Sequence, residues 1–146
     1  MSACIFCDIL AGKAPSSVVL RDELCWAFLD IQPVNPGHVL VIPTCHASSL
    51  AELDEESGSH MFRTAQRLAQ ALRASGLKCE GVNFFLADGE AAGQEVFHVH
   101  LHVIPRYAGD RFGLRFGPEY YNLPTRAELD RMADEFRGAF PGRPNP

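Results

Sequence analysis

Three histidines alternate with apolar residues in the stretch 96–104: His98, His100 and His102. Successive side chains of a β-strand point to opposite faces, so these imidazoles should share one face of a strand, about 7 Å apart. The residues between and after them should line the other, buried face: Phe97, Val99, Leu101 and Val103. Half of the six histidines of the chain lie here, which indicates a chemical site.

A row of imidazoles permits two kinds of chemistry. A neutral imidazole, with an ordinary pKa of about 6.5, is a nucleophile near pH 7 and can attack phosphorus to form a covalent phosphoramidate. Such a nucleophile must donate from one ring nitrogen so that the other keeps its lone pair. His100 has a histidine on either side, and His38 is a candidate fourth member of the set. The alternative is a metal site, because His-x-His on a strand is a natural chelate.

The loop that precedes the histidines contains small residues, Ala91-Ala92-Gly93-Gln94. Small side chains let backbone N–H groups approach an anion closely. The amide of Gln94 adds two side-chain donors. Beside the histidine row, this loop predicts a phosphate-binding segment.

Two cysteines near the start, Cys4 and Cys7, have the spacing of half a zinc site. The other half could come from His46, His98 or Cys45, and the alternative is a pair of free thiols. The chain has five cysteines. This odd count, in a sequence without a secretion signal, predicts a reducing cytoplasm.

The length of 146 residues suits one domain over 1–146, with a frayed tail over 141–146. A net charge of −5 and a pI near 5.6 argue against nucleic-acid binding, which needs a basic patch. A small anionic ligand held by local donors stays possible. No apolar run approaches the roughly 20 residues of a membrane span, and the first residues lack the basic and apolar regions of a signal peptide.

The elements that must position these residues alternate between strands and helices. Asp54 is the expected N-cap of the long helix. The buried stripe of this helix should consist of Met61, Phe62, Ala65, Leu68, Ala69 and Leu72. Thr125 opens a capping box at the start of the C-terminal helix. This order predicts an α+β fold with an antiparallel sheet of about five strands, and a homodimer would cover its exposed face or edge. The expected ranges are helix 4–10, a hairpin of strands 18–21 and 24–29, a central strand 38–43, helix 54–75, strand 81–86, the histidine strand 96–105, an irregular segment 106–123, and a C-terminal helix to about 140.

The row His98-Val-His100-Leu-His102-Val-Ile, preceded by Gly93-Gln94, resembles the signature of the histidine triad (HIT) nucleotide-binding proteins. The resemblance extends over nearly the whole chain. The segment 4–9 resembles the N-terminus of bacterial members, and segments 27–31 and 36–43 resemble the nucleoside-binding half of the family. Ile104-Pro105-Arg106-Tyr107 resembles bacterial and Fhit-like members more than the Hint branch.

This resemblance implies a homodimer with one continuous sheet and a site for a purine nucleoside monophosphate. It implies a hydrolase or transferase that cleaves AMP-type substrates at the α-phosphate, either nucleoside phosphoramidates or dinucleoside polyphosphates, through a nucleotidyl-histidine intermediate. His100 would be the nucleophile, and His102 would bind the phosphate or the leaving group. His98 and His38 would support orientation and proton handling.

The resemblance also implies the remaining ligands. Asp30 would bind the ribose hydroxyls, Ile31 would pack on the base, and the phosphate would lie on the loop residues Gly93, Gln94, Glu95 and Val96. A structural zinc would bind to Cys4, Cys7, His46 and His98. Such an ion would tie the segment 1–12 to the catalytic strand and orient one histidine.

Two residues depart from the family pattern. Glu95 stands where many relatives have Ser or Thr, and Ala87 where many have Asn. A carboxylate close to a phosphate is electrostatically unfavourable, and strand alternation predicts that Glu95 points away from the histidines. These departures keep open a nucleotide-binding interaction protein with little catalysis. A metal-dependent hydrolase that uses the histidine row as ligands is a third hypothesis.

Overall fold

The computed structural model describes residues 4–142, and the chain divides into a unit up to Phe112 and a second unit from Gly113 onward. Residues 1–3 and 143–146, which hold most of the expected frayed tail, lie outside the described part. We expected one domain over the whole length, and each unit is described by itself below.

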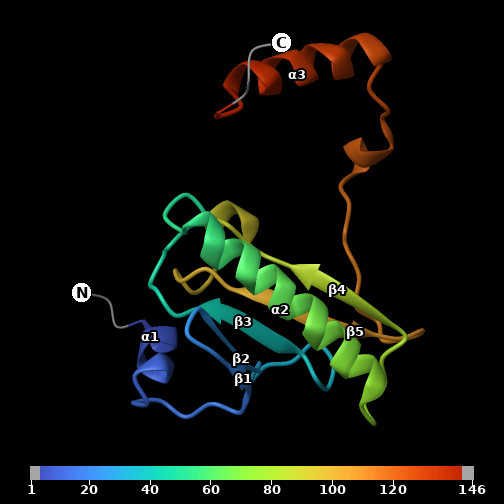
Figure 1. Ribbon diagram of the computed structural model, residues 1–146. Coiled ribbons are helices and arrows are strands. Elements are labelled where there is room, and N and C mark those ends of the chain that lie inside the picture. Colours follow the sequence, from blue (N-terminus) through green and yellow to red (C-terminus); the bar gives the residue numbers. More distant parts are fainter. Residues whose placement is uncertain (1–3, 143–146) are drawn as a thin grey trace. The chain divides into compact units, whose positions relative to one another are not determined.

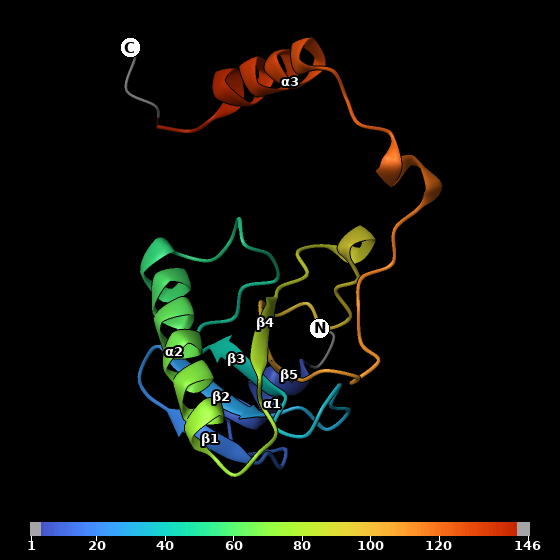
Figure 2. The same ribbon diagram turned by 90° about the vertical axis from the view of Figure 1, so that its right-hand side faces the viewer.

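The first unit is a five-stranded antiparallel sheet with a helix on each face (Figures 1 and 2). The strand order is β1-β2-β3-β5-β4, so that β3 lies in the centre, as its continuous apolar sequence predicts. The α+β class and the five strands are confirmed. The elements are α1 (Ile5–Leu10), β1 (Val18–Arg21), β2 (Cys25–Leu29), β3 (Val39–Pro43), α2 (Glu55–Ala74), β4 (Gly81–Phe85), a short 3-10 turn η1 (Glu90–Ala92) and β5 (Leu101–Arg106).

Apolar side chains cover both faces of the sheet. On one face, the stripe of α2 packs against strand residues such as Val41 and Val103, which are fully buried. On the other face, Phe6 and Ile9 of α1 pack on a smaller group of β2 and β3 residues. Burial of apolar surface contributes about 25 cal/mol per Å², so the sheet is held from both sides. The site lies on the α1 face.

The long helix begins and ends where the sequence predicts. Asp54 caps it by accepting a hydrogen bond from the Ser57 backbone N–H at 2.8 Å, and Ser75 is the C-cap. The prediction is wrong for one member of the expected stripe, because the Phe62 side chain is 49% exposed. It lies at the margin of the stripe, against the ring of Phe84 on the edge strand β4.

The histidine strand is shorter than expected. β5 begins only at Leu101, and the preceding segment 96–100 is not a strand. Its backbone bonds elsewhere, since His98 N–H donates to the carbonyl of Val96 and Val99 N–H to that of Ala47. Strand alternation therefore fails before residue 101, and Phe97 is 51% exposed instead of buried.

The second unit contains a 3-10 turn, η2 (Pro118–Tyr121), and the helix α3 (Arg126–Ala139). The irregular segment before the helix is confirmed, with η2 as a local exception. Thr125 and Glu128 form the predicted capping box. Within the described residues, no helix is long and apolar enough to cross a membrane.

Gly37, directly before His38, occupies a backbone conformation that only glycine adopts without strain. Its φ is +93°, and a Cβ there would lie 2.8 Å from Leu77 Cδ1 and 3.1 Å from Leu72 Cδ2. Gly12 has a φ of +71° but open space around it. We predict that Gly12→Ala costs about 1–2 kcal/mol from the backbone alone, and that Gly37→Ala costs about 1 kcal/mol more, because the buried Leu72 side chain must give way.

Urea denaturation of both variants measures this difference in the free energy of unfolding. Equal losses of unfolding free energy would show that Leu72 and Leu77 leave room for a Cβ at position 37.

Candidate active site and metal centre

The α1 face of the sheet carries a row of residues that are register neighbours across four strands. Phe28 of β2 lies opposite Leu40 of β3, Leu40 opposite His102 of β5, and His102 opposite Phe85 of β4. All four line a pocket of about 690 Å³. A pocket of this size suits a small-molecule ligand. The sheet register thus places His102 among apolar side chains in the floor of the pocket.

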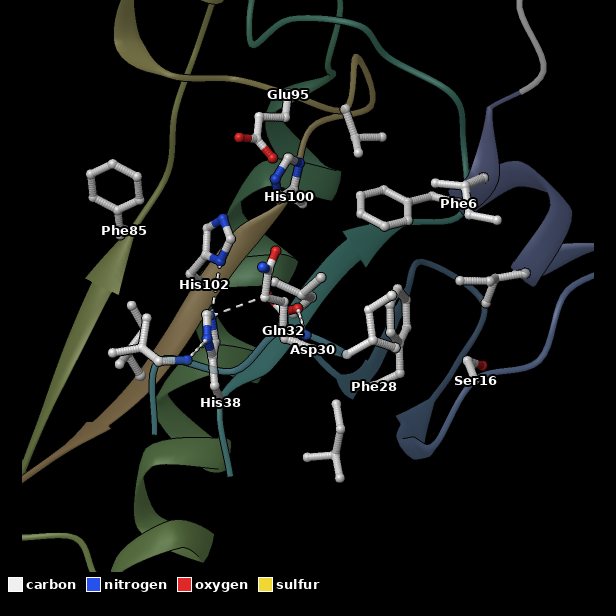
Figure 3. Close-up of a pocket in the computed structure, with 18 of the residues that line it drawn as sticks. Phe6, Ser16, Phe28, Asp30, Gln32, His38, Phe85, Glu95, His100 and His102 are labelled. Carbon is white, nitrogen blue, oxygen red and sulfur yellow. Dashed lines mark hydrogen bonds and ion pairs between the residues drawn. The ribbon is translucent and has the colours of Figure 1, made fainter. Parts of the chain in front are cut away.

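The structure brings the predicted histidines together (Figure 3). His38, buried beside β3, lies with its Nε2 2.9 Å from Nδ1 of His102. The rings of His100 and His102 are 4.9 Å apart between centroids, and both line the pocket. His98 is fully buried behind them and does not line it.

Backbone groups set the tautomers of these rings. The Val34 N–H donates to His38 Nδ1 at 3.1 Å, so the proton of His38 is on Nε2 and is donated to His102 Nδ1. His102 then carries its own proton on Nε2. The ring of His100 lies with Nδ1 2.8 Å from the carbonyl oxygen of His98. A carbonyl only accepts, so His100 Nδ1 is the donor and Nε2 keeps a free lone pair.

The surroundings of His38 and His102 favour the neutral form of each ring. Burial, with the neighbouring His100 and His38, lowers the pKa of His102 to about 4. Burial also lowers the pKa of His38, although the nearby Asp30 carboxylate opposes the shift. Both rings are therefore neutral at pH 7, which is the state that the hydrogen bond between them requires.

The rest of the pocket has apolar walls and carboxylates. Side chains of α1 and β2, with the 99% exposed Ile31, form the walls. Asp30 lies at the end of β2, where Oδ1 accepts from the Gln32 N–H at 2.8 Å and Oδ2 lies 3.7 Å from His38 Nε2. The formally charged side chains among the lining residues are Asp30 and Glu95.

The Gln94 side chain does not have the role that we predicted. Its Nε2 donates to the carbonyls of Ser48 and Val96, at 2.8 and 3.1 Å, and its Oε1 accepts from Gly89 N–H. Both donors are committed, so the amide shapes the loop and is not free for a phosphate. The free donors are instead main-chain groups, because the N–H groups of residues 95–97 donate to no acceptor in the described residues. Gly93, with a φ of +86°, and Val96 line the pocket beside them.

The prediction for Glu95 from strand alternation is also wrong. Glu95 lines the same pocket as His100 and His102, and Figure 3 shows its carboxylate beside the His100 ring. The cause is the missing strand, since the segment before Leu101 bends and does not alternate. The second departure, Ala87, is buried and outside the pocket lining.

A thiol–imidazole cluster forms behind the pocket from Cys4, Cys7, His46 and His98. Their ligand atoms all lie within 4.8 Å of one another, whereas Cys45 is not a member. Tetrahedral zinc, with bonds of about 2.3 Å to sulfur and about 2.0 Å to nitrogen, places its ligands about 3.5 Å apart. Three of the four sulfur–nitrogen distances here, Cys4–His98, Cys7–His46 and Cys7–His98, are 3.3–3.6 Å.

The protonation state of His98 suits a metal as well. Its Nε2 lies 3.0 Å from the Pro43 carbonyl oxygen and must donate to it. Nδ1, which faces both thiols, is then the lone-pair nitrogen that a metal needs. The residues of this cluster therefore fit zinc in donor type, number and spacing.

Phe6 is a site residue that sequence reasoning missed. Its ring lies edge-on to the rings of His98 and His100, at centroid distances of 5.8 and 5.2 Å. It separates the thiol–imidazole cluster from the pocket and packs on both. The sequence feature that could have identified Phe6 is its position as an apolar residue between two predicted metal ligands, Cys4 and Cys7.

Comparisons with known proteins agree with this geometry. The protein hit of Bacillus subtilis is 46% identical over 111 residues, which cover 75% of this chain and 76% of that protein. A Zn-bound histidine triad family protein from Mycobacterium smegmatis has a TM-score of 0.74 at 41% identity, covering 91% and 97% of the two chains. A histidine triad nucleotide-binding protein from Candida albicans has a TM-score of 0.82 at 28% identity, covering 94% and 96%.

The family comparison covers the histidine site itself. The HIT domain family matches residues 11–109. This range includes the pocket floor, the buried His38, and the row from His98 to His102. The chain belongs to the HIT family.

Proposed function

We propose that this protein is a nucleotide hydrolase or transferase that acts at the α-phosphate of purine nucleotides through a nucleotidyl-histidine intermediate. Membership of the HIT family supports the general class. The observation that carries the proposal is the hydrogen bond from His100 Nδ1 to the His98 carbonyl. It directs the lone pair of the ring to Nε2, on a side chain that lines the pocket.

The pocket offers a separate place for each part of a nucleoside monophosphate. The base packs between Phe28 and Ile31, and the carboxylate of Asp30 accepts from the ribose hydroxyls. The phosphate oxygens accept from the free main-chain N–H groups of residues 95–97 and from Nε2–H of His102. These donors are neutral, which fits a protein of net charge −5 that binds an anion with local dipoles.

The reaction proceeds in two displacements. His100 Nε2 attacks the α-phosphorus, the bond between phosphorus and the leaving group breaks, and its electron pair departs with that group. Water then attacks the phosphorus, gives up a proton, and releases the nucleoside monophosphate and free His100. Splitting one displacement into two lowers the barrier of each. The dipoles of residues 95–97 stabilise the charge that develops on the phosphoryl oxygens.

The thiol–imidazole cluster supports this site without entering the reaction. Cys4, Cys7, His46 and His98 would hold a zinc ion whose chemistry is structural. Fixing His98 fixes its carbonyl, and that carbonyl orients His100. Within the pocket, the described residues offer one candidate metal group, formed by Asp30, His38 and His102, and it does not include His100. The hypothesis of a metal-dependent hydrolase that uses the whole histidine row as ligands therefore loses support.

His100 provides the direct test. We predict that wild-type protein, mixed with an adenosine 5′-phosphate donor and quenched, carries a nucleotidyl group on His100 by mass spectrometry. His100→Asn should abolish the adduct and lower turnover by at least about a thousandfold, because no other group replaces the nucleophile. His60→Asn, a histidine on α2 outside the pocket, is the matched control and should behave as wild type.

Normal turnover by folded His100→Asn would refute the mechanism. Tight AMP binding without adduct or turnover in the wild type would instead favour a nucleotide-binding interaction protein, the function that Glu95 and Ala87 kept open.

Zinc content and stability test the metal proposal. We expect one zinc per chain in the purified protein, and a lower melting temperature after chelation, because the ion binds only the folded cluster. Cys7→Ser should lose the metal, whereas Cys45→Ser should keep it, since this neighbouring thiol is not in the cluster. A wild-type chain that takes up no zinc at saturating concentration would exclude the site.

We also propose a homodimer that joins two sheets along β4. This strand is at the edge of the sheet, and its Phe84 and Phe85 are exposed, as is Phe62 beside them on α2. An uncovered apolar edge strand favours pairing with another chain. Sedimentation equilibrium should give twice the chain mass, and Phe84→Lys should shift the population to monomer. A monomeric wild type at micromolar concentration would contradict this arrangement.

A further inference from the structure

The pocket has an unusual balance of charge for a site that binds a phosphate. Among the described residues that line it, none is Lys or Arg. The formally charged ones are two carboxylates, Asp30 and Glu95. His38 and His102 add no charge at neutral pH, because burial lowers the pKa of each. One phosphate can be held by main-chain N–H groups, but the described lining residues offer no Lys or Arg for a second or third phosphate.

The two carboxylates lie at different places along the pocket. Asp30 adjoins the apolar walls that suit a nucleoside, whereas Glu95 lies beside His100 on the side away from Asp30 and Phe28 (Figure 3). A nucleotide with its sugar at Asp30 and its phosphorus at His100 therefore directs its leaving group toward Glu95. The carboxylate is exposed and makes no hydrogen bond or ion pair with any described residue, so its charge is free to act on that group.

This placement separates two classes of leaving group. A polyphosphate leaving group brings further negative charge next to the Glu95 carboxylate, and the two like charges repel each other. An amine leaving group has the opposite property, since its nitrogen is positively charged once protonated. The carboxylate then attracts the leaving atom at the moment when its bond to phosphorus breaks.

We propose that Glu95 determines leaving-group specificity in this site, by favouring an amine leaving group over a polyphosphate leaving group. This inference rests on the proposed nucleotidyl transfer to His100. The phosphoramidate nitrogen first takes a proton from solvent. The bond from His100 Nε2 to phosphorus then forms, the P–N bond breaks with its electron pair going to nitrogen, and a neutral amine leaves.

Paired substrates with the same nucleoside test this role. Turnover is measured on an adenosine 5′-phosphoramidate of a simple alkylamine and on diadenosine triphosphate, and kcat/KM for the first is divided by that for the second. The wild type should prefer the phosphoramidate. Glu95→Gln, which removes the charge and keeps the shape, should lower this ratio by about tenfold or more. Glu90→Gln removes an exposed carboxylate of the same loop, outside the pocket, and should leave the ratio unchanged.

A binding measurement supplies a readout that does not depend on turnover. In the His100→Asn background, calorimetry compares AMP with ADP, whose second phosphate extends toward Glu95. Adding Glu95→Gln should improve ADP binding relative to AMP by a similar factor, and Glu90→Gln should not.

The possible failures are distinguishable. A wild type that turns over neither substrate and forms no His100 adduct would overturn the proposed function and this inference with it. A wild type that forms the adduct, but whose substrate ratio and ADP-to-AMP ratio are the same after Glu95→Gln, would overturn the role of Glu95 alone.

Discussion

The site depends on one hydrogen bond, from His100 Nδ1 to the carbonyl oxygen of His98 at 2.8 Å. Without it the ring could carry its proton on either nitrogen, and the nucleophilic lone pair could be directed away from the ligand. The acceptor belongs to a residue that is itself fully buried. His98 is held through Nε2 by the Pro43 carbonyl and through Nδ1 by the thiol–imidazole cluster. The position of His100, the proposed nucleophile, is therefore set by the packing and the thiol contacts of His98, two residues earlier in the chain.

The sheet supplies the second half of this arrangement. The pairing of β3 with β5 sets Leu40 opposite His102, and the turn before β3 places His38 against the same ring. A backbone N–H from Val34 then determines the tautomer of His38 and, through it, that of His102. Both tautomers are thus determined by main-chain groups, which cannot ionise. Burial keeps the intervening rings neutral, so the relay holds over the pH range in which an imidazole nucleophile is useful.

The sequence alone predicted the fold class, the order of the elements and which histidines lie together in the candidate site. Buried strands and helix ends are set by apolar runs and by capping residues such as Asp54, and such local signals are visible in a sequence. The predictions that failed concerned features set by backbone hydrogen bonds to distant segments. The strand begins only at Leu101 because Val99 bonds to Ala47, and no periodicity predicts that contact. The position of the Glu95 side chain and the hydrogen bonds of the Gln94 amide follow from the same bend. Likewise, spacing alone left His46, His98 and Cys45 as equal candidates for the metal, and only the packing of α1 against β3 separates them.

The same bend separates the nucleophile from the residue that faces the leaving group. His98 is buried and held through both ring nitrogens, and His100 is buried and held through Nδ1, so a substitution at either one would disturb the cluster, the sheet or the tautomer. Glu95 is exposed and has no partner among the described residues, and its neighbour Gln94 already holds the loop through three hydrogen bonds. In the proposed reaction, a change of charge at position 95 therefore alters what can leave the phosphorus without moving the group that attacks it. The proposed leaving-group preference depends on one exposed residue, whereas the histidine geometry depends on buried ones.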